Sequence, residues 1–126
     1  YPTLQALNPR LIYLSLSGYG QHGPLAQRPG HDLNFLAAAG IVGLSGTPDG
    51  PPDHTIGAPV GDLAGSMYAL TALLGALLQR QHNGLGQFLD VSISDALVGW
   101  MAPRIGVHQQ GHGDAAARHG GGGGAR

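Results

Sequence analysis

The stretch GDLAGSMYALTALLGALLQRQHNG, residues 61–84, decides the fold class of this chain. Its apolar residues recur at spacings of three and four, which predicts an amphipathic helix over residues 62–81. Asp62 is a good N-cap for this helix, and Asn83-Gly84 is a good C-cap. The apolar run Leu63–Leu78 is shorter than the ~20 residues of a membrane span, so we expect a buried helix of a soluble protein. The positions that set the period are Leu63, Met67, Leu70, Leu74 and Leu77.

Short apolar segments on both sides of this helix predict strands. Leu11–Leu16 has the composition of a buried parallel strand, and Gln87–Ile93 predicts a second strand. Two further helices are expected, one over Asp32–Ala39 and one that Ser94 caps and Pro103 ends. Strand, helices, strand and helix in this order are typical of an α/β fold.

The composition excludes several classes of function. Hydrophobic residues make up 42% of the 126 residues, charged residues only 10%, and the net charge is −1, so no basic surface for nucleic acid is expected. The absence of cysteine excludes disulfides, thiol catalysis and Cys-ligated zinc, and it suits a cytoplasmic protein. The abrupt ends suggest an internal fragment. We expect residues 1–106 to be part of one domain, and the Gly/His/Ala-rich residues 107–126 to be poorly ordered.

Two residues at helix starts marked by glycine are the candidate catalytic groups. His31 follows Gly30, and Asp62 follows Gly61. Each lies where backbone N–H groups and the positive end of a helix dipole act on it, so the two can form an acid/base pair. Taken singly, each has a simpler structural explanation, a packed histidine and an N-cap.

A metal site is not expected in this chain. His108 and His112 are four residues apart, with Asp114 close behind, a spacing that would share a metal on a helix. Gly111 and Gly113 disfavour a helix there. Asp90 and Asp95, which flank the end of the second strand, are interpreted as structural.

Four stretches, taken in order, resemble the class III CoA-transferase superfamily, which includes formyl-CoA transferase and alpha-methylacyl-CoA racemase. The resemblance covers residues 4–101 and implies a fragment of the large Rossmann-like α/β domain of that fold. It also implies an acyl-CoA thioester as substrate, no cofactor beyond that coenzyme A, and an interlocked homodimer. The stretches are Asn8–Tyr13 with Ser17–Gly20, Gly23-Pro24 with Arg28–Asp32, Pro59–Tyr68, and Gly84–Gln87 with Asp90–Ser92.

The resemblance also implies roles for individual residues. Asp62 matches the catalytic aspartate, which is the nucleophile in transferases and a proton-transfer group in racemases. His31 matches the second proton-transfer group of the racemases. The backbone N–H of Asp32 is implied to hold the thioester oxygen. The acyl-CoA site would be lined by Gly30, His31, Asp32, Leu33, Asn34 and Phe35.

Three hypotheses for function follow. The first is racemisation of 2-methylacyl-CoA thioesters by 1,1-proton transfer through an enolate, between His31 and Asp62. The second is transfer of CoA between carboxylic acids through an aspartyl-CoA thioester at Asp62. The third is a non-catalytic fragment. The chain has no glutamate to match the partner of the racemase histidine, and its turn at residues 46–52 is more similar to transferases.

Overall fold

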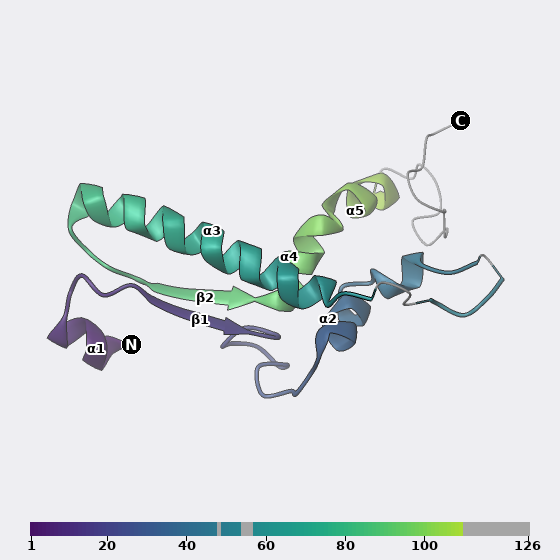
Figure 1. Ribbon diagram of the computed structural model, residues 1–126, viewed down its shortest axis with the longest axis horizontal. Helices are drawn as coiled ribbons and strands as arrows, with labels where there is room; N and C mark the ends of the chain where they lie inside the picture. Colours follow the sequence, from purple (N-terminus) through teal and green to yellow (C-terminus); the bar gives the residue numbers. More distant parts are fainter. Residues whose placement is uncertain (48, 54–56, 110–126) are drawn as a thin grey trace.

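Two parallel strands and a long crossover connection form the body of the protein (Figure 1). The computed structural model describes residues 1–47, 49–53 and 57–109. In the two-stranded sheet, Tyr13 lies opposite Phe88 and Ser17 lies opposite Ser92. The predicted parallel strands and the α/β class are therefore confirmed, with the first strand two residues further along the chain at its start. The bounds are β1 (Tyr13–Ser17) and β2 (Phe88–Ser92).

Short helices accompany the sheet and the long helix α3, which spans Val60–Asn83 and runs alongside the strands (Figure 1). Helix α2 begins at Asp32, as predicted, and ends one residue early, before Gly40 with its positive φ of 81°. The other elements are α1 (Pro2–Leu7), α2 (Asp32–Ala38), the 3-10 helix η1 (Val42–Leu44), α4 (Ile93–Trp100) and α5 (Ala102–Gln109).

Helix α3 is longer than the predicted residues 62–81 by two residues at each end, and it closes at the predicted Gly84 C-cap. Gly84 adopts the left-handed conformation, with φ of 75°, and donates its N–H to the Arg80 carbonyl. At the other end Pro59 is the N-cap, and its carbonyl accepts the N–H of Leu63 at 3.0 Å. Asp62 therefore lies inside the first turn, and the prediction that it caps the helix is wrong.

The face of α3 that packs against the protein is made of small residues, not of the large apolar residues that the period suggested. The exposed fractions of Leu63, Met67, Leu70 and Leu74 are 54, 62, 48 and 53%. The prediction of a buried leucine stripe is therefore wrong. Small residues let the α3 backbone approach its neighbours closely, which leaves the larger side chains on the outer side. The buried positions are Gly61, Ala64, Gly65, Ala69 and Ala76.

Helix α3 is longer than the apolar run Leu63–Leu78, which by itself is too short for a membrane span. Helix α3 has 24 residues, and its most apolar 18-residue window has a mean hydropathy of 1.4, so α3 is long and apolar enough to cross a membrane by length and composition alone. The rest of the protein buries 28% of its most apolar window. One such helix is weak evidence for a membrane span, because core helices of soluble proteins pass the same test.

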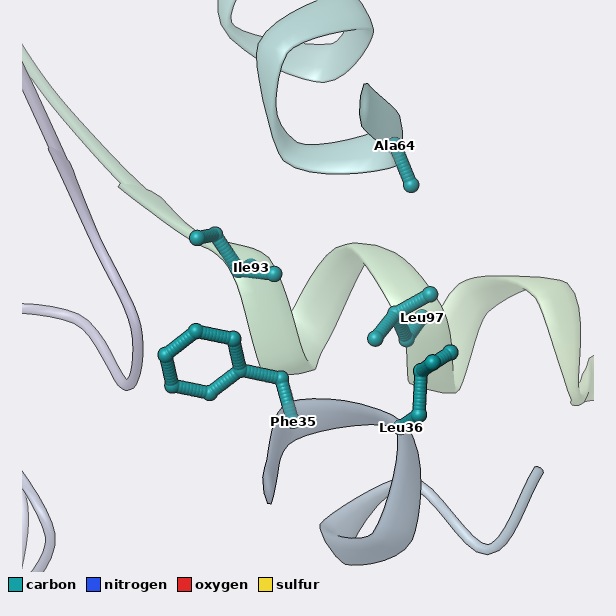
Figure 2. Close-up of a cluster of buried hydrophobic side chains, with 5 residues drawn as sticks. All are labelled: Phe35, Leu36, Ala64, Ile93 and Leu97. Carbon is teal, nitrogen blue, oxygen red and sulfur yellow. The ribbon is translucent and has the colours of Figure 1, made fainter. Parts of the chain in front are cut away.

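The hydrophobic core lies where α2, α3 and α4 meet, next to the carboxyl ends of the strands (Figure 2). Phe35 and Leu36 point from α2 toward Ile93 and Leu97 of α4, and Ala64 approaches from α3. Leu97 is fully buried, and Leu36 is 2% exposed. Because α4 begins directly after β2, this core fixes the helix starts of α2 and α3 at the carboxyl end of the sheet.

One helix is predicted after the second strand, whereas the described part of the structure has two, α4 and α5, which meet at Met101. Ser92, not Ser94, caps α4, and its Oγ accepts the N–H of Asp95 at 3.1 Å. Pro103 does not end a helix but lies in the first turn of α5, where a residue without an N–H costs no hydrogen bond. The boundary expected after residue 106, between the domain and a poorly ordered end, falls inside α5. Residues 110–126, which include His112 and Asp114, lie outside the described residues.

Candidate active site at two helix starts

A glycine-rich loop after β1 leads the chain toward the start of α2. Gly20, with φ of 80°, turns this loop beside β2, and the Gln21 N–H donates to both carboxylate oxygens of Asp90, at 2.9 and 3.2 Å. Asp90 therefore has the structural role that the sequence indicated. Where the loop reaches the start of α2, a Cβ on Gly30 would lie 2.7 Å from the Phe35 ring. Glycine is needed there because the backbone passes directly over that ring.

The main chain of His31 is held at the start of α2 while its side chain is exposed. His31 is the N-cap, with extended backbone angles, and its N–H donates to Oδ1 of Asn34 at 2.9 Å. The His31 carbonyl accepts the Asn34 N–H at 2.8 Å. These two hydrogen bonds orient the residue without covering the imidazole, which is exposed in this chain.

The start of α3 is capped by a carboxylate from α2. Oδ1 of Asp32 accepts the N–H of Gly61 at 2.6 Å and the N–H of Asp62 at 3.1 Å. We call this pair of hydrogen bonds the Asp32 bridge. The first N–H groups of a helix lack partners within the helix. Asp32 supplies here the acceptor that the sequence pattern assigned to Asp62, and the Asp62 side chain is exposed.

The Asp32 bridge brings the two candidate catalytic residues to adjoining helix starts. His31 precedes Asp32 in the chain, and the backbone N–H of Asp62 is one of the two donors. Of the other residues expected to line an acyl-CoA site, Leu33 and Asn34 are exposed, whereas Phe35 is 5% exposed and belongs to the core. Phe35 thus supports the start of α2 from behind, and the lining of an acyl-CoA site stays a prediction.

The cap that the Asp32 side chain provides for α3 was missed at the level of sequence. The residues involved are 29 and 30 positions apart, so no local pattern reveals the contact. One indirect signal exists: the position before the helix is Pro59, which has no side-chain oxygen to cap α3. A helix start without a local side-chain acceptor leaves its N–H groups to water, a ligand or a distant residue, and here the distant residue is Asp32.

In the part of the chain that the structure covers, neither a metal site nor the hollow described next belongs to the candidate site. Within the described ranges, no group of three or more His, Asp or Glu side chains is placed to hold a metal ion. A hollow of about 460 Å³ lies toward the other end of α3, away from the helix starts. Its walls are formed by Asn8, Arg10, Leu11, Ile12, Leu73, Leu77 and Arg80.

Known proteins of similar sequence and structure are CoA-transferases and members of their family. The acetyl-CoA:oxalate CoA-transferase of Acetobacter aceti is 41% identical over 101 residues, which cover 80% of this chain and 26% of that protein. The succinyl-CoA–D-citramalate CoA-transferase of Chloroflexus aurantiacus is 39% identical over 106 residues, 84% of this chain and 26% of that protein. The chain thus spans about a quarter of the length of these relatives.

A solved structure and a family model agree with these relatives. The crystal structure of a CAIB/BAIF family protein from Brucella suis matches with a TM-score of 0.80 and 36% identity, and it covers 88% of this chain and 29% of that one. The model of CoA-transferase family III matches residues 1–125. The resemblance expected from the four sequence stretches is confirmed, and the chain belongs to CoA-transferase family III.

Proposed function

We propose that the full-length protein transfers CoA between carboxylic acids, with Asp62 as the nucleophile. One observation carries the proposal: the Asp62 side chain is exposed at a helix start whose backbone N–H groups donate hydrogen bonds to the Asp32 carboxylate of another helix. A nucleophile must be accessible to the substrate and attached to a backbone of fixed position, and this arrangement supports both. The names of the relatives support transfer over racemisation and so reverse the order of the first two hypotheses.

The proposed reaction proceeds through two kinds of covalent intermediate at Asp62. The carboxylate attacks the thioester carbonyl of the donor, the C–S bond breaks, and CoA departs as thiolate. A mixed anhydride between Asp62 and the donor acyl group remains. The thiolate then attacks the aspartyl carbonyl, which releases the donor acid and forms aspartyl-CoA. The acceptor carboxylate attacks aspartyl-CoA to form a second anhydride, and the thiolate attacks its acyl carbonyl. New acyl-CoA and the free Asp62 carboxylate result, so all atoms balance.

The start of α2 supplies the neighbouring part of this proposed site. The resemblance implies that the Asp32 backbone N–H holds the thioester oxygen, where negative charge develops during attack. His31, Leu33 and Asn34 are exposed beside it and are proposed to contact the acyl-CoA. We further propose that the full-length protein acts in the cytoplasm as an interlocked homodimer, in which the partner chain covers apolar surface of this one.

Asp62→Asn tests the assignment of the nucleophile. Purified full-length protein would be assayed with acetyl-CoA and oxalate, and with succinyl-CoA and D-citramalate, the pairs that the relatives' names suggest. We expect a loss of kcat of about 1,000-fold or more, because an amide cannot form the anhydride. Asp95→Asn is the matched control, since Asp95 is also an aspartate in the first turn of a helix and should keep full activity.

An isotope experiment distinguishes covalent from non-covalent roles of Asp62. With an acceptor acid labelled with ¹⁸O in its carboxylate, turnover should place label in the Asp62 side chain, which mass spectrometry of the peptide would detect. Transfer without label in Asp62, or full activity of Asp62→Asn, would overturn the proposal.

Racemisation is the second candidate, because His31 is exposed and lies one residue from the Asp32 bridge. One residue would remove the α-proton of a 2-methylacyl-CoA, and the other would return a proton to the opposite face of the enolate. Incubation in deuterated water tests this: incorporation of deuterium that both His31→Ala and Asp62→Ala abolish would favour racemisation. CoA transfer that survives in His31→Ala favours the transferase. If the protein shows neither racemisation nor CoA transfer, the hypothesis of a non-catalytic protein remains.

A further inference from the structure

We infer that Asp32 is a positioning residue for Asp62. By accepting the backbone N–H groups at the start of α3, the Asp32 carboxylate keeps these donors from binding the Asp62 carboxylate. The inference rests on the proposed function, because it assigns Asp32 a part in the reaction at Asp62. It differs from the role that the family resemblance implies for Asp32, which concerns the backbone N–H of that residue and not its side chain.

The hydrogen bonds of the Asp32 bridge are the first observation. A single oxygen, Oδ1 of Asp32, accepts from both Gly61 and Asp62, at 2.6 and 3.1 Å. Gly61 is buried and Asp32 is half-buried, so the stronger of the two contacts is sheltered from water. Hydrogen bonds to an ionised acceptor are roughly twice as strong as neutral ones. The direction of the α3 backbone at Asp62 is therefore set from α2.

The packing around Gly61 is an independent observation that this contact is built into the fold. A Cβ at Gly61 would lie 2.9 Å from Oδ1 of Asp32 and 3.2 Å from Cδ1 of Leu97, which is fully buried. Any larger residue would push the carboxylate or the core side chain aside. Glycine at position 61 thus permits the close approach that the short hydrogen bond requires.

Competition for backbone donors explains why this matters for the chemistry. The free N–H groups of a helix start bind a nearby carboxylate, and aspartate side chains readily fold back on their own backbone. Asp62 is the acidic residue in the first turn of α3. With the donors of Gly61 and Asp62 already occupied by Asp32, the exposed Asp62 side chain does not need to fold back on these two N–H groups, and its oxygens stay available for attack on a thioester.

The test is a kinetic comparison of Asp32→Ala, Asp32→Asn and Ser92→Ala in the full-length protein. The probes are acetyl-CoA with oxalate and succinyl-CoA with D-citramalate. We expect kcat of Asp32→Ala to fall about 30-fold with KM for the acyl-CoA changed less than about 3-fold, since only the direction of the nucleophile is lost. Asp32→Asn keeps an oxygen that accepts both N–H groups, so it should restore kcat to within about 5-fold.

Ser92→Ala is the matched control for a merely structural role. Ser92 caps the neighbouring helix α4 next to the same core, so its loss removes a helix cap without touching the Asp32 bridge. The kcat of Ser92→Ala should stay within about 3-fold of the parent. Its loss of stability, measured by urea denaturation, should be comparable to that of Asp32→Ala.

Three results would overturn the inference. Asp32→Ala with kcat near that of the parent would show that the bridge has no effect on the reaction, while the ¹⁸O label in Asp62 would leave the proposed function intact. Equal losses of kcat in Asp32→Ala and Ser92→Ala would show a structural role only. Full activity of Asp62→Asn would remove the proposed function and this inference together.

Discussion

At its amino end α3 is capped by a carboxylate from another helix, whereas at its carboxyl end it is closed by its own next residue. Asp32 reaches Gly61 and Asp62 across 29 and 30 positions of the chain. Gly84 needs only a left-handed φ of 75° to return its N–H to Arg80. The candidate catalytic residue lies at the end that depends on tertiary structure.

The packing of α3 differs between its ends in the same way. Toward the amino end the helix approaches α4 so closely that a Cβ on Gly65 would lie 2.7 Å from Cγ1 of Ile93. Further along, a Cβ on Gly75 would meet nothing within 4 Å in the described part of the chain. A glycine inside a helix therefore has a packing role only where a neighbour occupies the space of its missing side chain.

Gly65→Ala should have the largest effect on stability of the changes that test this comparison. The added methyl group overlaps Ile93, and we expect a loss of about 2 kcal/mol in the free energy of unfolding. Urea denaturation followed by circular dichroism would measure it. Combined with Ile93→Ala, Gly65→Ala should lose less than the sum of the two single variants, because Ile93→Ala removes Cγ1, the atom that overlaps. No change in midpoint for Gly65→Ala would contradict the close approach of α3 and α4.

Gly84→Ala tests the local closure at the carboxyl end. A residue with a Cβ is strained at positive φ, so we expect a loss of about 1 kcal/mol, measured by thermal unfolding. Gly84→Asn is the control, because asparagine tolerates the left-handed conformation better and should lose less. Equal stability of both variants and the parent would argue against a left-handed Gly84.

Gly75→Ala should have the smallest effect, and of opposite sign. Alanine favours the helix over glycine, and the space at Gly75 is open, so we expect a gain of about 0.5 kcal/mol. Differential scanning calorimetry of Gly75→Ala and Gly65→Ala would compare the effect of the same substitution on stability at two positions of one helix. A clear loss of stability at position 75 would mean that further protein packs on this part of α3.

Local patterns predicted the elements of this fold well. The two strands, the long helix and its Asn83-Gly84 end were found from spacing and capping residues within a few positions of one another. Asp62 and His31 were also found this way, because glycine marks a backbone near a helix start. The serine that caps α4 was misplaced by two residues, from Ser94 to Ser92, since either hydroxyl fits a local cap.

Contacts between distant segments account for the predictions that failed. The period of the leucines in α3 identified a stripe but not its direction, and Leu63 and Met67 lie on the exposed side. Local sequence predicts Asp62 as a cap, because no residue near it in the chain competes for the backbone donors of α3. The competitor, Asp32, becomes a neighbour only when the core of Phe35, Ala64 and Leu97 joins α2 to α3 and α4.

The class of the fold and the family could be established from the amino-acid sequence, because they depend on spacings of a few residues and on motifs that lie in order along the chain. The same motifs nominate His31 and Asp62 as candidate catalytic residues, and that role stays a prediction. Which aspartate caps α3 and which is exposed depends instead on how the helices pack. The reason is physical: a helix start offers several N–H donors but does not specify which carboxylate accepts them. Packing at Gly61 assigns them to Asp32 and leaves the Asp62 side chain exposed.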